Sequence, residues 1–193
     1  TWDPRWYQAI AAHGYDDAAD LSPQLRVLCP DHTQVGCART PDRHSNLAFF
    51  PLFPAAIRML SSAGIEPLFG ALVLATTASL VASALIALIA RDVFDERAGV
   101  IAVALWGAMP VNVALSSGRP ESLFVALAAG SLWLLARHPV WAAVLAALAG
   151  LTRFQAIAVI VPVMVAAWVR PNRLTTRLAV TAIAPLGLLA FLG

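Results

Sequence analysis

The stretch PLFGALVLATTASLVASALIALIA, residues 67–90, decides the fold class of this chain. It runs for 24 residues without a charge, and as a helix it would be about 36 Å long, which exceeds the roughly 30 Å of a bilayer's hydrocarbon core. The whole chain of 193 residues is 60% hydrophobic and only 12% charged, whereas soluble domains are roughly 25% charged. This composition excludes a water-soluble globular domain and indicates an all-α, polytopic bundle of transmembrane helices. Without a basic stripe, nucleic acid is not an expected partner.

Other apolar runs flank this one, and short charged turns separate them. The runs are residues 98–117, 122–136, 140–152, 154–169 and 178–193. We therefore expect about six spans in a bundle of residues 48–193, preceded by an irregular loop of residues 1–47 with short helical stretches. Pro110 lies near the middle of one run and predicts a kink there.

Two of the runs are short for a membrane span. Residues 140–152 would reach only about 20 Å as a helix, so these spans must be interrupted or must carry Arg153 partly into the membrane. Breaks in the backbone at membrane depth are tolerated where protein or a wet cavity covers them. The short runs therefore predict a cavity, and with it a site.

The arginines predict the orientation of the bundle. If each run crosses the membrane once, the turns on one side carry Arg91, Arg97, Arg137, Arg170, Arg173 and Arg177. The turns opposite carry only Arg119 and Arg153. The positive-inside tendency places the six-arginine side in the cytoplasm, so we expect the N-terminal loop on the extracytoplasmic or lumenal face. Because the chain begins at Thr1 and ends within an apolar run, we expect it to be a piece of a longer protein.

Both cysteines of the chain lie in the N-terminal loop. Cys29 and Cys37 are separated by a stretch with Pro and Gly, and a disulfide fits an oxidising compartment. With His32 and His44 they also form the pattern C-x2-H-x4-C-x6-H, four candidate zinc ligands. This is not a standard zinc spacing, so the loop favours a disulfide or free thiols over a metal site.

Asp3 is the first candidate for chemistry, because it lies between aromatic rings. Trp2, Trp6 and Tyr7 surround it in the sequence, with Arg5 beside them. Aromatic walls exclude water and raise the pKa of a carboxylate, which suits a general base. Alternatively, the rings form an interfacial belt and Asp3 caps a helix.

A second group of candidates begins at Arg119, before the apolar run from Ser122. Pro120 suits the first helical position, and a helix start with an adjacent arginine can bind phosphate. Glu121 could instead occupy the positive helix end, or pair with Arg119 or Arg153 as a structural ion pair. Ionisable residues at membrane depth are usually functional.

Arg153 separates two apolar runs and lies on the same predicted face of the membrane as Asp3 and Arg119. Gln155 follows it two residues later. Arg153 is either part of a site or an arginine whose charged end reaches the interface. The aromatic, proline-broken stretch of residues 49–54 precedes the first span, and it predicts either a wedge along which a lipid chain docks or an interface anchor.

Four short motifs, taken in order, carry a family resemblance. They are Trp2-Asp3, Phe49 to Pro54, Pro120 to Phe124, and Leu151-Thr152-Arg153. In this order they resemble the PIG-V-type mannosyltransferases, which belong to the GT-C glycosyltransferases. The resemblance implies a multispanning enzyme that takes mannose from a polyprenyl-phosphate sugar donor on the outer or lumenal face and passes it to a lipid-linked acceptor. It also implies that Asp3 is the catalytic carboxylate.

The chemistry expected from this resemblance is an inverting transfer. Asp3 accepts the proton of an acceptor hydroxyl, while Arg153 and Arg119 hold the departing phosphate. Trp2, Arg5, Trp6, Glu121 and Gln155 complete the expected substrate site. If arginines serve the phosphate, the displacement needs no metal or cofactor.

Two other classes stay open from the sequence. A transporter would also show interrupted helices and buried arginines, although it would not need a polar loop of some 45 residues. A non-catalytic membrane subunit predicts that Asp3, Glu121 and Arg153 lie far apart. The use of Arg without Lys, with abundant Ala, suggests a genome rich in G and C. The resembled family has bacterial members, so we expect a bacterial plasma membrane, or the endoplasmic reticulum if the source is eukaryotic.

Overall fold

A computed structural model describes residues 7, 8, 10–12, 14, 49–109, 118–171 and 173–192. Within these residues every regular element is a helix, which confirms the all-α fold class. The elements are α3 (Leu52–Ser62), α4 (Pro67–Val93), α5 (Glu96–Ala108), α7 (Glu121–Leu134), α8 (Pro139–Gly150), the 3-10 helix η3 (Phe154–Ala156), α9 (Ile157–Val169), α10 (Leu174–Ile183) and α11 (Leu186–Leu192).

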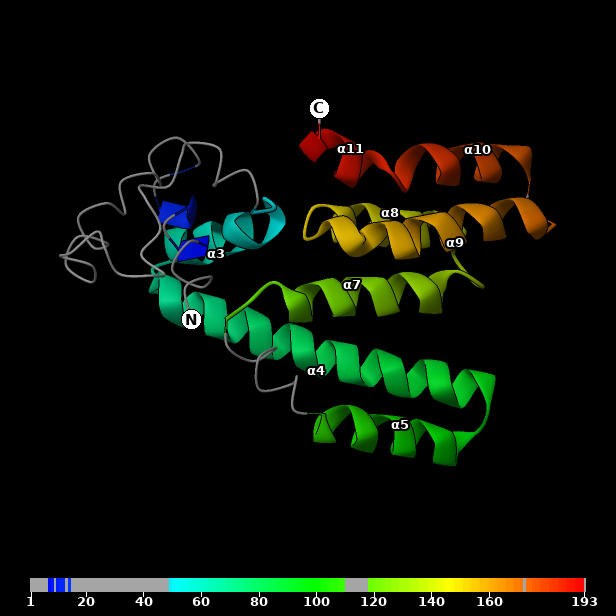
Figure 1. Cartoon of the computed structure of the whole chain (residues 1–193), viewed down its shortest axis with the longest axis horizontal. Coiled ribbons are helices and arrows are strands. Elements are labelled where there is room, and N and C mark those ends of the chain that lie inside the picture. Colours follow the sequence, from blue (N-terminus) through cyan, green and yellow to red (C-terminus); the bar gives the residue numbers. More distant parts are fainter. Residues whose placement is uncertain are drawn as a thin grey trace, which may run out of the picture.

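The longer helices lie side by side with similar axis directions, whereas α3 lies at one end of the bundle (Figure 1). Helix α4 packs between α5 and α7, and α7 packs in turn against α8. Helix α8 is central, because α9, α10 and α11 also contact it. The chain therefore runs back and forth, and its turns collect at two opposite ends (Figure 1).

Helix α4 begins and ends where its local chemistry requires. The Glu66 carboxylate accepts hydrogen bonds from the backbone N–H groups of Leu68 and Phe69, and Pro67 occupies the first helical position. After Phe94, Asp95 caps α5 by accepting from the N–H of Ala98 at 2.7 Å. The helix predicted from residues 67–90 is thus confirmed, with three more residues at its end.

Two helical segments within the described residues are long and apolar enough to cross a membrane, Pro67–Val93 and Leu174–Phe191. Three shorter apolar helices, Glu121–Leu134, Pro139–Gly150 and Phe154–Val169, lie alongside them. Large apolar side chains point outward from the bundle, for example Leu80 (67% exposed) and Val100 (69% exposed). Such a surface suits lipid rather than water, and the number of crossings stays a prediction.

Pro51, Pro54 and Pro120 lie at the starts of two helices. Of the aromatic stretch at residues 49–54, the first three residues precede the helix, Pro51 caps α3 and Pro54 lies in its first turn. Backbone N–H groups have no helical partner in a first turn, so proline costs nothing there. Pro120 was expected at the first helical position, but it is the N-cap of α7, whose first residue is Glu121. Pro110 lies outside the described residues, and α5 ends at Ala108.

The last helical segment starts earlier than the apolar pattern predicted. The turn expected at residues 170–177 ends at Arg173, because α10 begins at Leu174 and includes Arg177. The Arg177 guanidinium lies 5.8 Å from the centroid of the Trp168 ring, so its apolar stem follows the helix while its charge lies over an aromatic face.

Alanine and glycine let the central helices approach closely. Ala142, Ala143, Ala146 and Ala149 of α8 are fully buried. A Cβ added to Gly187 of α11 would collide with the backbone carbonyl of Ala147. Small residues at helix contacts allow this proximity in membrane proteins, where packing rather than water exclusion drives helix association.

Replacing Gly187 with Ala is expected to destabilise the bundle, since α11 must move off α8. Overpacking costs typically about 1–3 kcal/mol, and this outweighs the gain of about 1 kcal/mol from replacing a helical glycine. Gly107 of α5 is the matched control, because a Cβ there meets nothing within 4 Å. Thermal unfolding of the full-length parent in detergent should show a lower midpoint for Gly187→Ala and an unchanged or higher one for Gly107→Ala. Equal midpoints for the two variants would contradict the close approach.

Candidate functional site

Glu121 and Arg153 meet at the end of the bundle where α7 begins and α8 turns into α9. Before α7, Gly118 has a φ of +75°, and the chain there lies against Ala71 of α4. This left-handed conformation favours glycine. Pro120 then caps α7, so Glu121 is its first residue. The contact with α4 and the cap together fix the position of Glu121 at the start of α7.

Arg153 is positioned by the turn that follows α8. Helix α8 ends at Gly150, and the buried Thr152 hydroxyl donates to the carbonyl of Ala149 at 2.6 Å. The N–H of Arg153 also donates to that carbonyl, at 3.2 Å. Arg153 itself is extended, with φ of −160° and ψ of 149°, and is the N-cap residue of η3. This geometry directs its side chain away from the α8 axis and toward α7.

The two side chains form an ion pair. Arg153 Nη1 lies 3.0 Å from Glu121 Oε1, and the side chains are 35% and 27% exposed. The other carboxylate oxygen, Oε2, is buried and accepts no hydrogen bond among the described residues. Of the arrangements that the sequence left open, the structure shows pairing of Glu121 with Arg153 and a place at the start of α7. The carboxylate also lies at the positive end of α7, where the helix dipole stabilises it.

Helix α3 joins the same end of the bundle through the backbone. The N–H of Leu52 donates to the carbonyl of Leu151 at 3.0 Å, so the start of α3 is bonded to the turn that carries Arg153. Phe53 is fully buried, and the Phe50 ring stacks on Phe191 with centroids 4.1 Å apart. Phe53 therefore packs within the protein. Both interpretations of residues 49–54 from the sequence, a lipid wedge and an interface anchor, had placed this stretch against the membrane.

The N-terminal segment reaches this end through Tyr7. Its ring makes edge contacts with Phe49 and Phe53, at centroid distances of 5.0 and 5.3 Å. The same apolar cluster includes Leu123 from the first turn of α7.

The remaining predicted site residues fall into two groups. Arg119 is half-buried directly before the α7 cap, and its carbonyl accepts from the Ser122 hydroxyl at 3.5 Å; Gln155 is exposed in η3. The other candidates lie outside the described residues: Trp2, Asp3, Arg5, Trp6, and the loop residues Cys29, His32, Cys37 and His44. In the part of the chain that is described, no three His, Cys, Asp or Glu side chains gather as metal ligands.

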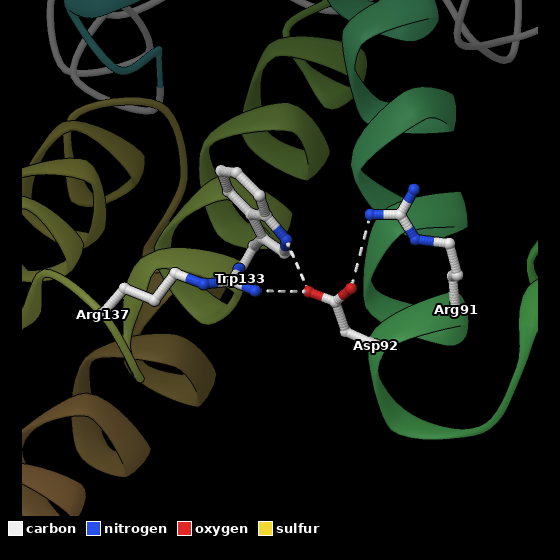
Figure 2. A network of polar contacts seen from close by, with 4 residues as sticks. All are labelled: Arg91, Asp92, Trp133 and Arg137. Carbon is white, nitrogen blue, oxygen red and sulfur yellow. Dashed lines mark hydrogen bonds and ion pairs between the residues drawn. The ribbon is translucent and has the colours of Figure 1, made fainter.

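A polar network at the opposite end was not predicted as such. Figure 2 shows Asp92, at the end of α4, between Arg91, Trp133 and Arg137. Asp92 Oδ2 accepts from Arg137 Nη2 at 3.2 Å and from Trp133 Nε1 at 3.3 Å. Arg91 Nη2 lies 3.5 Å from Asp92 Oδ1. The network links the α4–α5 turn to the end of α7. The sequence showed only that the turns are rich in charge. It did not indicate the pairing, because Trp133 and Arg137 lie 41 and 45 positions after Asp92.

Comparison with known protein families matches residues 49–193 to the family described as dolichyl-phosphate-mannose-protein mannosyltransferase. The matched region begins at Phe49 and includes every described residue of the site apart from Tyr7. Neither the curated proteins nor the solved structures contain a significant match to the chain.

Proposed function

Since the chain belongs to the dolichyl-phosphate-mannose-protein mannosyltransferase family, we propose that it transfers mannose to a hydroxyl of a lipid-linked glycan on the extracytoplasmic or lumenal face. The family is of GT-C type, and its general activity is that of a membrane mannosyltransferase with a polyprenyl-phosphate mannose donor. The acceptor, the face and the closer kinship with PIG-V-type enzymes are our proposal.

The observation that carries the proposal is the meeting of three motifs that are far apart in the sequence. Residues 49–54 bond to Leu151 through the backbone, Glu121 pairs with Arg153, and Leu123 packs in one cluster with Phe53. A non-catalytic subunit was expected to keep Glu121 and Arg153 far apart, whereas the two side chains form an ion pair. Their meeting supports a site at this end of the bundle.

The proposed mechanism is a single inverting displacement. The acceptor hydroxyl gives its proton to Asp3, and its oxygen bonds to the anomeric carbon of mannose. The bond from that carbon to the phosphate oxygen breaks, and polyprenyl phosphate leaves with the electron pair. Arg153 and Arg119 offset the charge that builds on this phosphate. No step in this sequence requires a redox partner.

In this mechanism Glu121 acts as a positioning residue for Arg153. The ion pair joins Nη1 of the guanidinium to Oε1 of the carboxylate, and a guanidinium carries five N–H donors in a fixed plane. The ion pair would hold that plane in one orientation while donors on its other edges serve the phosphate. Arg153 would then meet its ligand already ordered, which lowers the entropy cost of binding.

A protein acceptor is the second candidate, because the description of the matched family names protein mannosyltransferases. A serine or threonine hydroxyl would undergo the same displacement. The two candidate acceptors differ in the product, because the mannose becomes attached either to a lipid-linked glycan or to a polypeptide.

The test is transfer of labelled mannose from polyprenyl-phosphate mannose by the full-length parent in membranes, with products divided into solvent-extractable lipid and protein. We expect the label in the lipid fraction. Label confined to protein would replace the lipid acceptor with the protein acceptor. No transfer by a correctly inserted parent, while a nucleotide-linked mannose is used instead, would overturn the proposed donor.

A further inference from the structure

Four arginines gather at the end of the bundle opposite the proposed site. They are Arg137 in the α7–α8 turn and Arg170, Arg173 and Arg177 around the α9–α10 turn, and we refer to them as the arginine cluster. Arg170 Nη1 donates to the carbonyl of Leu135 at 3.0 Å, which holds the α9–α10 turn against the end of α7. Arg177 Nη2 in turn lies 3.4 Å from the carbonyl of Arg170. Two turns that are distant in the sequence thus form one cationic surface.

Few acidic groups balance this surface. Residues 122–193 contain no Asp or Glu at all. Asp92 reaches Arg137, but it is also shared with Arg91. The carboxylate of the neighbouring Asp95 caps α5 through the N–H of Ala98, and Glu96 beside it is followed directly by Arg97. The arginine cluster therefore keeps an excess of positive charge, which an external anion would relieve.

The surface directly beside the cluster is aromatic and apolar. The guanidinium of Arg137 lies 5.3 Å from the centroid of the Trp133 ring, as that of Arg177 lies over Trp168. Val169 and Leu174, next to the α9–α10 turn, are 79% and 62% exposed. Cations above exposed apolar side chains match a phospholipid, whose phosphate lies above its acyl chains. A free phosphate ion would leave Val169 and Leu174 uncovered.

We propose that the arginine cluster binds the headgroup phosphates of anionic phospholipids in the leaflet at this end of the bundle. Basic surfaces next to membrane helices attract anionic lipid, and guanidinium groups bind phosphate through paired hydrogen bonds. This inference does not depend on the proposed transfer reaction, since it uses the other end of the bundle.

The test is electron paramagnetic resonance of spin-labelled lipids around the full-length parent in phosphatidylcholine bilayers. The spectra give the motionally restricted fraction of labelled phosphatidylglycerol and of labelled phosphatidylcholine. We expect a several-fold preference for phosphatidylglycerol that decreases as salt is added. The double variant Arg170→Gln/Arg173→Gln should lose most of the preference, whereas Arg58→Gln, an exposed arginine on α3 at the other end, should retain it.

A variant with lysine at positions 170 and 173 separates charge from folding. It should keep most of the preference, and its result stands even if the glutamine variant fails to insert. Equal association of the two lipids with the parent would overturn the proposal, as would a preference unchanged in the glutamine variant. Loss of the preference on adding millimolar inorganic phosphate, at matched ionic strength, would identify a free anion as the ligand instead.

Discussion

Mannose transfer by an Asp3→Asn variant of the full-length parent is expected to fall by about 10³-fold, within the range for loss of a general base. The amide that replaces the carboxylate has nearly the same size but cannot accept the acceptor's proton. Binding of the donor should change little, because the polyprenyl phosphate is held by other groups. The measurement is the initial rate of labelled mannose transfer in membranes with equal amounts of inserted enzyme.

Asp31→Asn is the matched control for this variant. Asp31 belongs to the same predicted N-terminal loop, and its replacement removes the same charge from the chain. Its rate should equal that of the parent. If Asp3→Asn transferred mannose at the normal rate, the proposed base would be wrong, whatever the identity of the acceptor.

Replacement of Arg153 by Gln is the second large effect that we expect, with a loss of transfer of about 100-fold. Removing one preorganised donor from a developing negative charge typically costs about 10² to 10³ in rate. Arg153→Lys should recover part of the activity, because a point charge remains without the planar fork. Arg97→Gln, which removes an exposed arginine at the opposite end, should leave the rate unchanged.

Glu121→Gln distinguishes a positioning role from a purely structural ion pair. If the pair only stabilises the fold, Arg153→Gln and Glu121→Gln should each lower the unfolding midpoint by a similar amount. The double variant should then recover both stability and activity. If Glu121 orients Arg153 for the phosphate, the double variant should be as slow as Arg153→Gln alone. The pair is partly exposed, so its contribution to stability should be modest, about 1 kcal/mol or less.

Apolar runs were enough to predict most helices of the bundle. The run at 122–136 became α7 and the run at 140–152 became α8, each shifted by one or two residues. Helix ends differ because caps and prolines fix them, whereas hydropathy changes gradually across an interface. Helix α10 starts before its predicted run, since the Arg177 side chain lies over Trp168 and the helix can extend beyond its apolar part.

The contacts of the candidate site needed the tertiary structure. From the sequence, Glu121 had two arginine partners to choose from, and spacing alone does not decide between them. The turn at Leu151 and Thr152 directs Arg153 toward α7 and so determines the pair. The bond between Leu52 and Leu151 was invisible in the sequence because it joins backbone groups, which every residue other than proline carries.

The hydrogen bond between Leu52 and Leu151 can form only late in biosynthesis. Leu52 leaves the ribosome about 100 residues before Leu151, an interval of about 5 to 20 s at common elongation rates. During that time the N–H at the start of α3, which has no side-chain cap, has no partner from the α8–α9 turn. The nascent chain must therefore satisfy it with water or lipid headgroups, and the site closes only after the α8–α9 hairpin has been made.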